Sequence, residues 1–348
     1  SDRAGGTEAL ITIGKTKSVC PECMKVVPAI KGIGEDGIYL VKECNAHGKF
    51  QTLIWEGNAA DYLSWGRENL SAETPVNPKV KEKSCPDNCG LCEEHERKGC
   101  CMILEVTKRC NMHCPVCFAS AGEDREKGDI PICEIEKQYD FLMAHGGPFN
   151  IQLSGGEPTM RDDLPEIIHM GREKGFTFFQ LNTNGIRLAR EEGYAGKLKK
   201  AGLNTVFLQF DGVTDQVYET LRGQAMMELK KKAVLNCSEA ELLEKKSGKG
   251  CCCTTSDDSR QYVENQWSYS TKTYDEGEMT QTDALDEFLI RIHNETFAVS
   301  GMIFQDAWNL DLDRLKRCYI CEVDPDHGMV PFCAYNLTNL KGTYLYRK

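Results

Sequence analysis

The sequence predicts an α/β protein built around a partial (β/α)6 TIM-type barrel. Apolar runs rich in β-branched and aromatic residues are typical of buried strands, and they occur at 103–107, 150–154, 177–181 and 205–210. The last three begin about 27 residues apart, an interval that fits strand–helix units on a parallel sheet. Glycine or polar residues follow these runs, at the strand ends where such barrels carry their active sites.

Helices are expected between these strands. Apolar residues recur at helical spacing in 135–143 and 164–168, and further helices are expected at 190–201 and 218–235. A six-stranded barrel needs two more strands, but the polar residues 238–283 carry no clear strand pattern. The late part of the barrel is therefore expected to diverge.

The segment Cys110-Asn-Met-His-Cys114-Pro-Val-Cys117 places three cysteines at C-x3-C-x2-C spacing, in the loop after the first strand. Thiolates are the ligands that iron–sulfur clusters select. Three of them can hold three irons of a [4Fe-4S] cube and leave the fourth iron open to a small molecule, as open catalytic metal sites do. A structural zinc knuckle is the alternative for this spacing alone.

This spacing resembles the signature of the radical S-adenosylmethionine (SAM) superfamily. The resemblance makes Cys110, Cys114 and Cys117 the catalytic cluster ligands. It implies that SAM chelates the open iron and that an electron from the cluster cleaves it to methionine and a 5'-deoxyadenosyl radical. This radical abstracts a hydrogen atom from a substrate carbon. A reductase or ferredoxin is then the expected electron donor.

Gly155-Gly156-Glu157-Pro158, one strand later, matches the second motif of that superfamily. Two glycines let the backbone approach a ligand closely, and the family role of Gly155, Gly156 and Glu157 is to bind the amino group of SAM. Four polar residues at later strand ends are candidates for further SAM contacts, although Asn-Gly and Asp-Gly pairs are also common turns. They are Asn182, Asn184, Gln209 and Asp211.

An N-terminal unit carries two cysteine knuckles separated by the strand-like stretch 37–41. Cys20 and Cys23 form the first knuckle, and Cys44 and His47 form the second. The four suit a tetrahedral mononuclear site. Zinc fits such a set of three cysteines and one histidine, a rubredoxin-like iron is its competitor, and two unrelated reduced pairs are the alternative.

Two more cysteine groups are interpreted as auxiliary iron–sulfur clusters. The first repeats the C-x3-C-x2-C spacing, and Cys100 or Cys101 is expected to close it, with His95 interpreted as a solvated loop residue. The fourth ligand of the second is left open between Cys237 and the triplet Cys251–Cys253. The triplet is otherwise a thiol-reactive or metalloid site, or a loop with incidental thiols. The groups are Cys85, Cys89 and Cys92, and Cys318, Cys321 and Cys333.

The wider arrangement is similar to archaeal tetraether lipid synthase and its uncharacterised bacterial relatives, over about residues 15–236 and 300–337. The likeness rests on Cys-Pro-Glu-Cys, on Cys-Pro-x2-Cys-Gly-Leu-Cys, on Cys-Pro-Val-Cys-Phe-Ala, and on Arg-Cys with Pro-Phe-Cys-Ala-Tyr-Asn near the end. It implies radical carbon–carbon coupling of hydrocarbon chains. Because 238–299 departs from the pattern, a peptide or small molecule linked to a thiol, selenium or metalloid through Cys251–Cys253 is the alternative substrate.

The expected organisation has five parts. They are a mononuclear-metal domain at 1–80, an auxiliary-cluster segment at 81–102, the barrel core at 103–236, a divergent polar segment at 237–299, and a second auxiliary-cluster segment at 300–348.

Composition limits the function further. Nineteen cysteines, most in tight groups, favour metal chelation over disulfides and indicate a reducing, oxygen-poor cytoplasm. The net charge of −11 argues against a nucleic-acid partner. No signal peptide or transmembrane run is expected, and the substrate is expected to be a small molecule or lipid. The rival classes are an iron–sulfur electron carrier that does not bind SAM and a zinc-knuckle interaction module.

Overall fold

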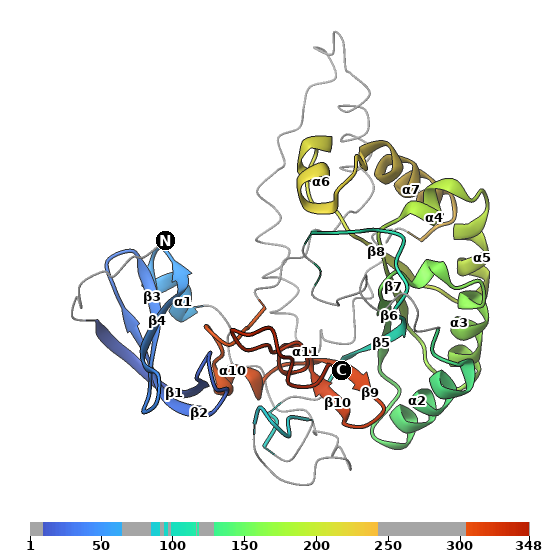
Figure 1. Cartoon of the computed structure of the whole chain (residues 1–348). Helices are drawn as coiled ribbons and strands as arrows, with labels where there is room; N and C mark the ends of the chain where they lie inside the picture. Colours follow the sequence, from blue (N-terminus) through green and yellow to red (C-terminus); the bar gives the residue numbers. More distant parts are fainter. Residues whose placement is uncertain are drawn as a thin grey trace. The chain divides into compact units, whose positions relative to one another are not determined.

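The computed structural model describes residues 10–64, 85–90, 94–96, 99–115, 117, 129–242 and 304–347. The chain divides into two compact units, the first from 1–102 and 302–348 and the second from 103–301. Figure 1 shows the chain with colours that follow the sequence from the N-terminus to the C-terminus. In the described part of the chain, no helix is long and apolar enough to cross a membrane.

The first unit begins with an antiparallel sheet in the order β1-β2-β3-β4. Its central strand β3 buries Ile38 and Leu40 completely. The turns between β1 and β2 and between β3 and β4 lie at the same end of the sheet and carry the N-terminal knuckles. The elements are β1 (Ile11–Val19), β2 (Val26–Ile33), β3 (Gly37–Cys44), β4 (Gly48–Glu56) and the short α1 (Ala59–Ser64).

The C-terminal segment belongs to the same unit. Strands β9 and β10 form an antiparallel hairpin, and a buried core that includes Leu310 and Val330 packs with Val19 from the first sheet. Asp311 accepts hydrogen bonds from the Thr16 hydroxyl at 2.6 Å and from Lys31 Nζ at 2.9 Å, so it also links this segment to the first sheet. The elements are α10 (Leu312–Leu315), β9 (Ile320–Asp324), β10 (Gly328–Pro331) and α11 (Phe332–Tyr335).

The second unit contains the predicted strand–helix repeat. Its strands follow the order β5-β6-β7-β8, with parallel pairing of β6 to β7 and of β7 to β8. Helices α2, α3 and α5 lie along one face of these strands (Figure 1). The strands are β5 (Cys101–Thr107), β6 (Asn150–Gly155), β7 (Phe179–Thr183) and β8 (Thr205–Leu208). The helices are α2 (Ile132–Ala144), η1 (Pro158–Met160), α3 (Leu164–Glu173), α4 (Ile186–Arg190), α5 (Tyr194–Ala201), α6 (Asp215–Arg222) and α7 (Met227–Glu239).

The fold class is confirmed, while two element predictions were wrong in detail. Strand β7 lies two residues later than expected because Asn182 and Thr183 still pair with β8. The predicted helix 218–235 is two helices. Gly223 ends α6 at φ +77°, and the Asp215 carboxylate accepts the N–H groups at the start of α7 at 2.8 Å.

Several sequence predictions lie outside the described residues. They concern Cys92, the polar stretch from 243 onward, the Cys251–Cys253 triplet and the two strands needed to complete six.

Candidate functional site

The cysteine loop follows β5. Cys110 and Cys114 are half-buried and pack against a core that includes Met112 and Tyr218, whereas Cys117 is exposed. Burial raises the pKa of the Cys110 thiol to about 11. A metal must displace this proton, because only the thiolate is a strong ligand.

Both glycines of the second motif are required because the loop after β6 lies very close to the backbone at the start of the cysteine loop. A Cβ atom at Gly155 would lie 2.2 Å from the Thr107 carbonyl oxygen, and one at Gly156 would lie 2.3 Å from that of Arg109. The Gly156 N–H donates to the Thr107 carbonyl and the Glu157 N–H to the Arg109 carbonyl, both at 2.8 Å. The glycines therefore let the loop after β6 dock on the start of the cysteine loop.

Glu157 joins the ends of β6 and β7. Its carboxylate is buried, and Oε1 accepts from the Thr159 and Thr183 hydroxyls at 2.6 Å each and from the Thr159 N–H at 3.1 Å. Oε2 accepts from the Asn184 N–H at 2.7 Å. Burial raises the pKa of Glu157, while these hydrogen bonds lower it. Since each carboxylate oxygen has about two acceptor positions, Oε2 retains one for a ligand.

The two asparagines after β7 differ in their partners. Asn184 donates from Nδ2 to Asn111 Oδ1 in the cysteine loop at 2.7 Å, and its Oδ1 accepts from the Ile186 N–H at 3.0 Å. Asn182 Oδ1 is buried and has no hydrogen-bond partner among the described residues. Asn184 is therefore a positioning residue in this structure, and Asn182 retains an acceptor for a ligand.

Gln209 and Asp211 hold an arginine that the sequence patterns did not indicate. Arg222, at the end of α6, makes a two-point ion pair with Asp211, with Nε to Oδ2 at 2.8 Å. It also donates to Gln209 Oε1 at 2.7 Å in the amide orientation that satisfies both groups. Its guanidinium is also close enough to Cys114 for their charges to interact. An arginine in the last helical turn usually only complements the helix dipole, so its position alone gave no signal.

Lys230 places a second cation near the cysteine loop. It is 1% exposed, donates from Nζ to the Asn184 carbonyl at 2.8 Å and lies 5.7 Å from the centre of the Tyr218 ring. Burial lowers its pKa to about 8. Glu157, Asp211 and Cys114 are close enough for their negative charges to oppose that shift.

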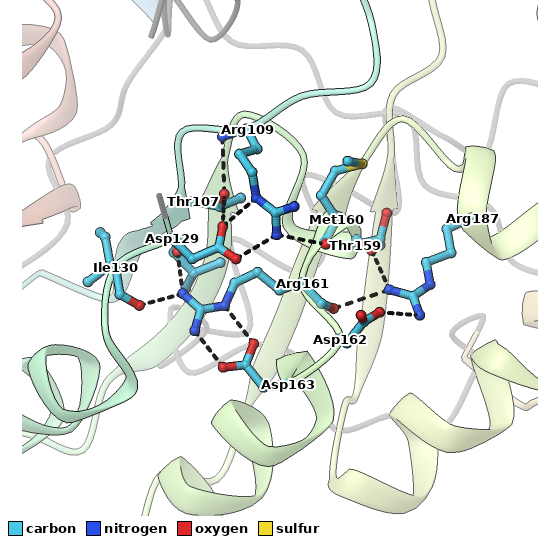
Figure 2. Close-up of polar contacts among 11 residues, drawn as sticks. Thr107, Arg109, Asp129, Ile130, Thr159, Met160, Arg161, Asp162, Asp163 and Arg187 are labelled. Carbon is cyan, nitrogen blue, oxygen red and sulfur yellow. Dashed lines mark hydrogen bonds and ion pairs between the residues drawn. The ribbon is translucent and has the colours of Figure 1, made fainter. Parts of the chain in front are cut away.

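Three arginines brace the loops at this end of the strands, as Figure 2 shows. Arg109 immediately precedes Cys110, and Arg161 and Arg187 follow the β6 and β7 motifs. Each guanidinium contacts both a carboxylate and a backbone carbonyl. The partners are Asp129 and the Met160 carbonyl for Arg109, Asp163 and the Val106 and Ile130 carbonyls for Arg161, and Asp162, Glu191 and the Thr159 and Arg161 carbonyls for Arg187.

The N-terminal knuckles form a four-ligand group in the first unit. Cys20, Cys23, Cys44 and His47 have ligand atoms that all lie within 4.8 Å of one another. His47 Nδ1 lies 3.5 Å from the sulfurs of both Cys20 and Cys44, and the sulfurs of Cys23 and Cys44 lie 3.9 Å apart.

These spacings fit one tetrahedral ion. Around zinc, with Zn–S of about 2.3 Å and Zn–N of about 2.05 Å, two sulfurs lie roughly 3.8 Å apart and a sulfur and a nitrogen roughly 3.5 Å apart. The predicted set of three cysteines and one histidine is thus arranged to hold a mononuclear metal, and His47 supplies the ligand that was least certain from the sequence.

The described cysteines of the two predicted auxiliary groups lie in the first unit. The sulfurs of Cys85 and Cys89 are 3.8 Å apart, and Cys318 and Cys333 are close enough for their thiols to interact. Cys321 is close enough to both Cys318 and Cys101 for their charges to interact. The Cys100 and Cys101 N–H groups both donate to the Tyr319 carbonyl, at 2.8 and 3.3 Å.

The interpretation of His95 as a solvated residue was wrong. Its side chain is buried, and Nε2 lies 2.6 Å from the Cys318 carbonyl oxygen. This partner comes 223 residues later in the chain, so no local pattern around His95 indicated its burial.

A strand–helix unit with a three-cysteine loop and a Gly-Gly-Glu motif docked on it defines the class of the second unit. A family model described as the Radical SAM superfamily matches residues 104–248. Residues 104–248 of this chain therefore match a radical SAM domain. A second model, the HMPTM N-terminal zinc ribbon domain, matches residues 12–56, so the first sheet is a zinc ribbon.

Two curated relatives are similar to this chain over part of its length. A 7,8-dihydro-6-hydroxymethylpterin dimethyltransferase of Methanocaldococcus jannaschii is 40% identical over 228 residues, which are 65% of this chain and 44% of the relative. An Fe-coproporphyrin III synthase of Methanosarcina barkeri is 36% identical over 140 residues, which are 40% of this chain and 34% of the relative. The chain thus spans less than half the length of either.

A solved structure, a histidine-tagged anSMEcpe with bound AdoMet, aligns over 41% of each chain with a TM-score of 0.35 and 20% identity. Neither curated relative is a tetraether lipid synthase, so that narrower resemblance stays a prediction.

Proposed function

We propose that this protein cleaves SAM reductively at a [4Fe-4S] cluster held by Cys110, Cys114 and Cys117, and abstracts a hydrogen atom from a substrate carbon. The observation that carries the proposal is the docking of the β6 loop on the cysteine loop through the Gly156 and Glu157 N–H groups. This docking holds the cluster ligands and the residues expected to bind SAM in one fixed arrangement, as proximity catalysis requires.

The chain's own residues can orient the cofactor. Asn182 Oδ1 and the remaining position on Glu157 Oε2 can accept hydrogen bonds from hydroxyl or amino groups of SAM. Arg222 and Lys230 supply positive charge for its carboxylate. When bound, the cluster supplies the electron that cleaves SAM to methionine and a 5'-deoxyadenosyl radical.

The comparisons favour methylation of a dihydropterin-like heterocycle as the overall reaction. The N-terminal ribbon matches the ribbon model of HMPTM, and the relative that is 40% identical is named as a dihydropterin dimethyltransferase. The lipid-like substrate and carbon–carbon coupling expected from the sequence motifs are the second candidate. Both candidates begin with the same hydrogen abstraction.

Anaerobic turnover tests the proposal. The reconstituted protein is given SAM and dithionite, and 5'-deoxyadenosine is measured by mass spectrometry for the wild type and for Cys114→Ala. We expect product only from the wild type. A cluster-loaded wild type that makes none would refute SAM cleavage.

Substrate class is tested in the same assay. We expect 7,8-dihydro-6-hydroxymethylpterin to accelerate 5'-deoxyadenosine formation. With a second SAM molecule as the methyl donor, which leaves as S-adenosylhomocysteine, the pterin should gain mass in 14-dalton steps, roughly one methylene each. Acceleration by a dialkyl lipid alone would favour the coupling reaction instead.

A further inference from the structure

The two ends of the cysteine loop are joined to each other by their side chains. Residues 110–128, which include the three cysteines, run between Arg109 after β5 and Asp129 before α2. Arg109 Nε donates to Asp129 Oδ1 at 2.8 Å, and Nη2 donates to Oδ2 at 2.5 Å. The Thr107 hydroxyl donates to the same Oδ1 at 2.6 Å. Three donors from one end of the loop therefore hold one carboxylate from the other end, as Figure 2 shows.

Arg161, in the loop after β6, bridges the same two ends a second time. Its Nη1 donates to the Val106 carbonyl near the end of β5 at 2.7 Å and to the Ile130 carbonyl before α2 at 2.6 Å. Its side chain is 3% exposed, and Asp163 accepts from its Nε at 2.8 Å and from its Nη2 at 2.6 Å. Loss of this guanidinium would leave both carbonyls without the donor that they share.

The first end of the cysteine loop is also fastened to the Gly-Gly-Glu motif. Arg109 Nη2 donates to the Met160 carbonyl at 3.0 Å. The Thr107 and Arg109 carbonyls accept from the Gly156 and Glu157 N–H groups at 2.8 Å each. A shift at the base of the cysteine loop would therefore move the backbone that carries the residues expected to bind SAM.

The form of these contacts sets them apart from an ordinary surface ion pair, which contributes little to stability. Arg109 and Asp129 meet through two parallel hydrogen bonds, the strongest arrangement for such a pair, and Thr107 beside them is fully buried. None of the contacts uses a cysteine sulfur, so they can form in the cluster-free chain. A loop whose ends are already fixed loses less conformational freedom when it binds a ligand.

We propose that Arg109, Asp129 and Arg161 form a clasp that holds the ends of the cysteine loop together and so positions its thiols for cluster binding. They are positioning residues, because they act through the backbone at the two ends of the loop. The proposal rests on the proposed function in one respect, namely that the loop binds an iron–sulfur cluster. The clasp itself is a property of the cluster-free chain and can be measured there.

Hydrogen exchange of the cluster-free protein tests whether the clasp holds the loop. Asp129→Ala removes the carboxylate, so the carbonyls that accept from the Gly156 and Glu157 N–H groups should become mobile. We expect these amides to exchange about tenfold faster than in the wild type, measured by mass spectrometry on peptides that cover residues 155–158.

Asp162→Ala is the matched control. Asp162 also pairs with an arginine of this site, Arg187, but its side chain is 93% exposed and the pair joins neither end of the cysteine loop. Arg187 keeps Glu191 and two backbone carbonyls as partners. Amide exchange in this variant should match the wild type.

Iron release tests what the clasp does for the cluster. After reconstitution with iron and sulfide without oxygen, we expect Asp129→Ala to release iron to a chelator about tenfold faster than the wild type. Asp162→Ala should release it at the wild-type rate. Asp129→Asn keeps one oxygen as an acceptor, so its amide exchange and its iron release should both be intermediate.

The two measurements separate this proposal from the proposed function. Unchanged amide exchange in Asp129→Ala would overturn the clasp, and faster exchange with unchanged iron release would overturn its role in cluster binding. A wild type that binds no iron would refute the proposed function, and amide exchange alone would then decide whether the clasp exists. If circular dichroism shows that Asp129→Ala is unfolded, Asp129→Asn takes its place under the same criteria.

Discussion

Asn184 donates a hydrogen bond from Nδ2 to Oδ1 of Asn111 at 2.7 Å, and so ties the loop after β7 to the loop that carries the three cysteines. Asn184 is 5% exposed, and its backbone N–H is also bound by Glu157. The three motif loops therefore form one hydrogen-bonded assembly, in which a change in one loop is transmitted to the others.

Asn111→Ala should loosen this assembly. The buried Asn184 amide would lose its acceptor, which costs about 1–3 kcal/mol of unfolding free energy. We expect the variant to release cluster iron to a chelator about tenfold faster than the wild type, measured from the loss of absorbance near 400 nm.

Asn182→Ala is the control, because it removes an acceptor that has no partner among the described residues. This variant should release cluster iron at the wild-type rate, and only its affinity for SAM should decrease. Equal iron release from Asn111→Ala and the wild type would contradict the positioning role of Asn111.

The parts of this site that were predictable from the sequence are those with a local cause. The strands and the glycines of the second motif can be recognised in the sequence, because burial and close backbone approach each leave a pattern within a few consecutive residues. Arg222 was not predictable, because its contacts with Gln209 and Cys114 arise only when the fold brings the end of α6 to residues distant in the sequence.

The division of the predicted helix 218–235 into α6 and α7 was also missed because it depends on a contact between residues distant in the sequence. The apolar pattern of 218–235 is continuous, but the Asp215 carboxylate caps α7 from eleven residues away, and Gly223 permits the turn between the two helices. A periodicity argument considers only the spacing of apolar residues, so it misses a side chain that competes for backbone N–H groups.

Arg222→Gln should lower the reduction potential of the radical SAM cluster. A positive guanidinium close to the Cys114 thiolate stabilises the reduced, more negative state of the cluster. Its removal should shift the reduction equilibrium at least tenfold toward the oxidised state, which is about 59 mV for one electron. An EPR-monitored redox titration without SAM measures this shift.

Two variants serve as controls for that titration. Arg222→Lys keeps the charge and should recover part of the potential, and Arg190→Gln alters an exposed arginine of α4 and should change nothing. An unchanged potential in a fully iron-loaded Arg222→Gln protein would argue against the contact with Cys114.

Cys44→Ala should release the metal of the zinc ribbon. Structural zinc contributes on the order of 10 kcal/mol to folding of small ribbons, and this residue also ends β3, so the sheet should unfold locally. Zinc analysis should find one equivalent fewer, and limited proteolysis should cut between β1 and β4.

His47→Cys supplies the comparison, because a set of four cysteines still suits tetrahedral zinc. It should retain the metal and resist proteolysis. A Cys44→Ala protein that keeps its zinc would show that the group of three cysteines and His47 is not the binding site.

Lys230→Met should stabilise the cluster-free protein at neutral pH and destabilise it at high pH. Burial lowers the pKa of Lys230 from 10.5 to about 8, so protonation favours the unfolded chain. The penalty is full below about pH 8, decreases as the pH rises, and is gone above 10.5. At about 1.4 kcal/mol for each pKa unit, it amounts to about 3 kcal/mol.

Methionine removes this penalty but also the hydrogen bond to the Asn184 carbonyl, which is worth about 1 kcal/mol. We therefore expect urea unfolding to give a variant about 2 kcal/mol more stable than the wild type at pH 7 and about 1 kcal/mol less stable near pH 10.5. Lys231→Met changes the adjacent lysine, which pairs with the exposed Glu228, and should show neither effect. If Lys230→Met were less stable at both pH values, the hydrogen bond, and not the buried charge, would dominate at this position.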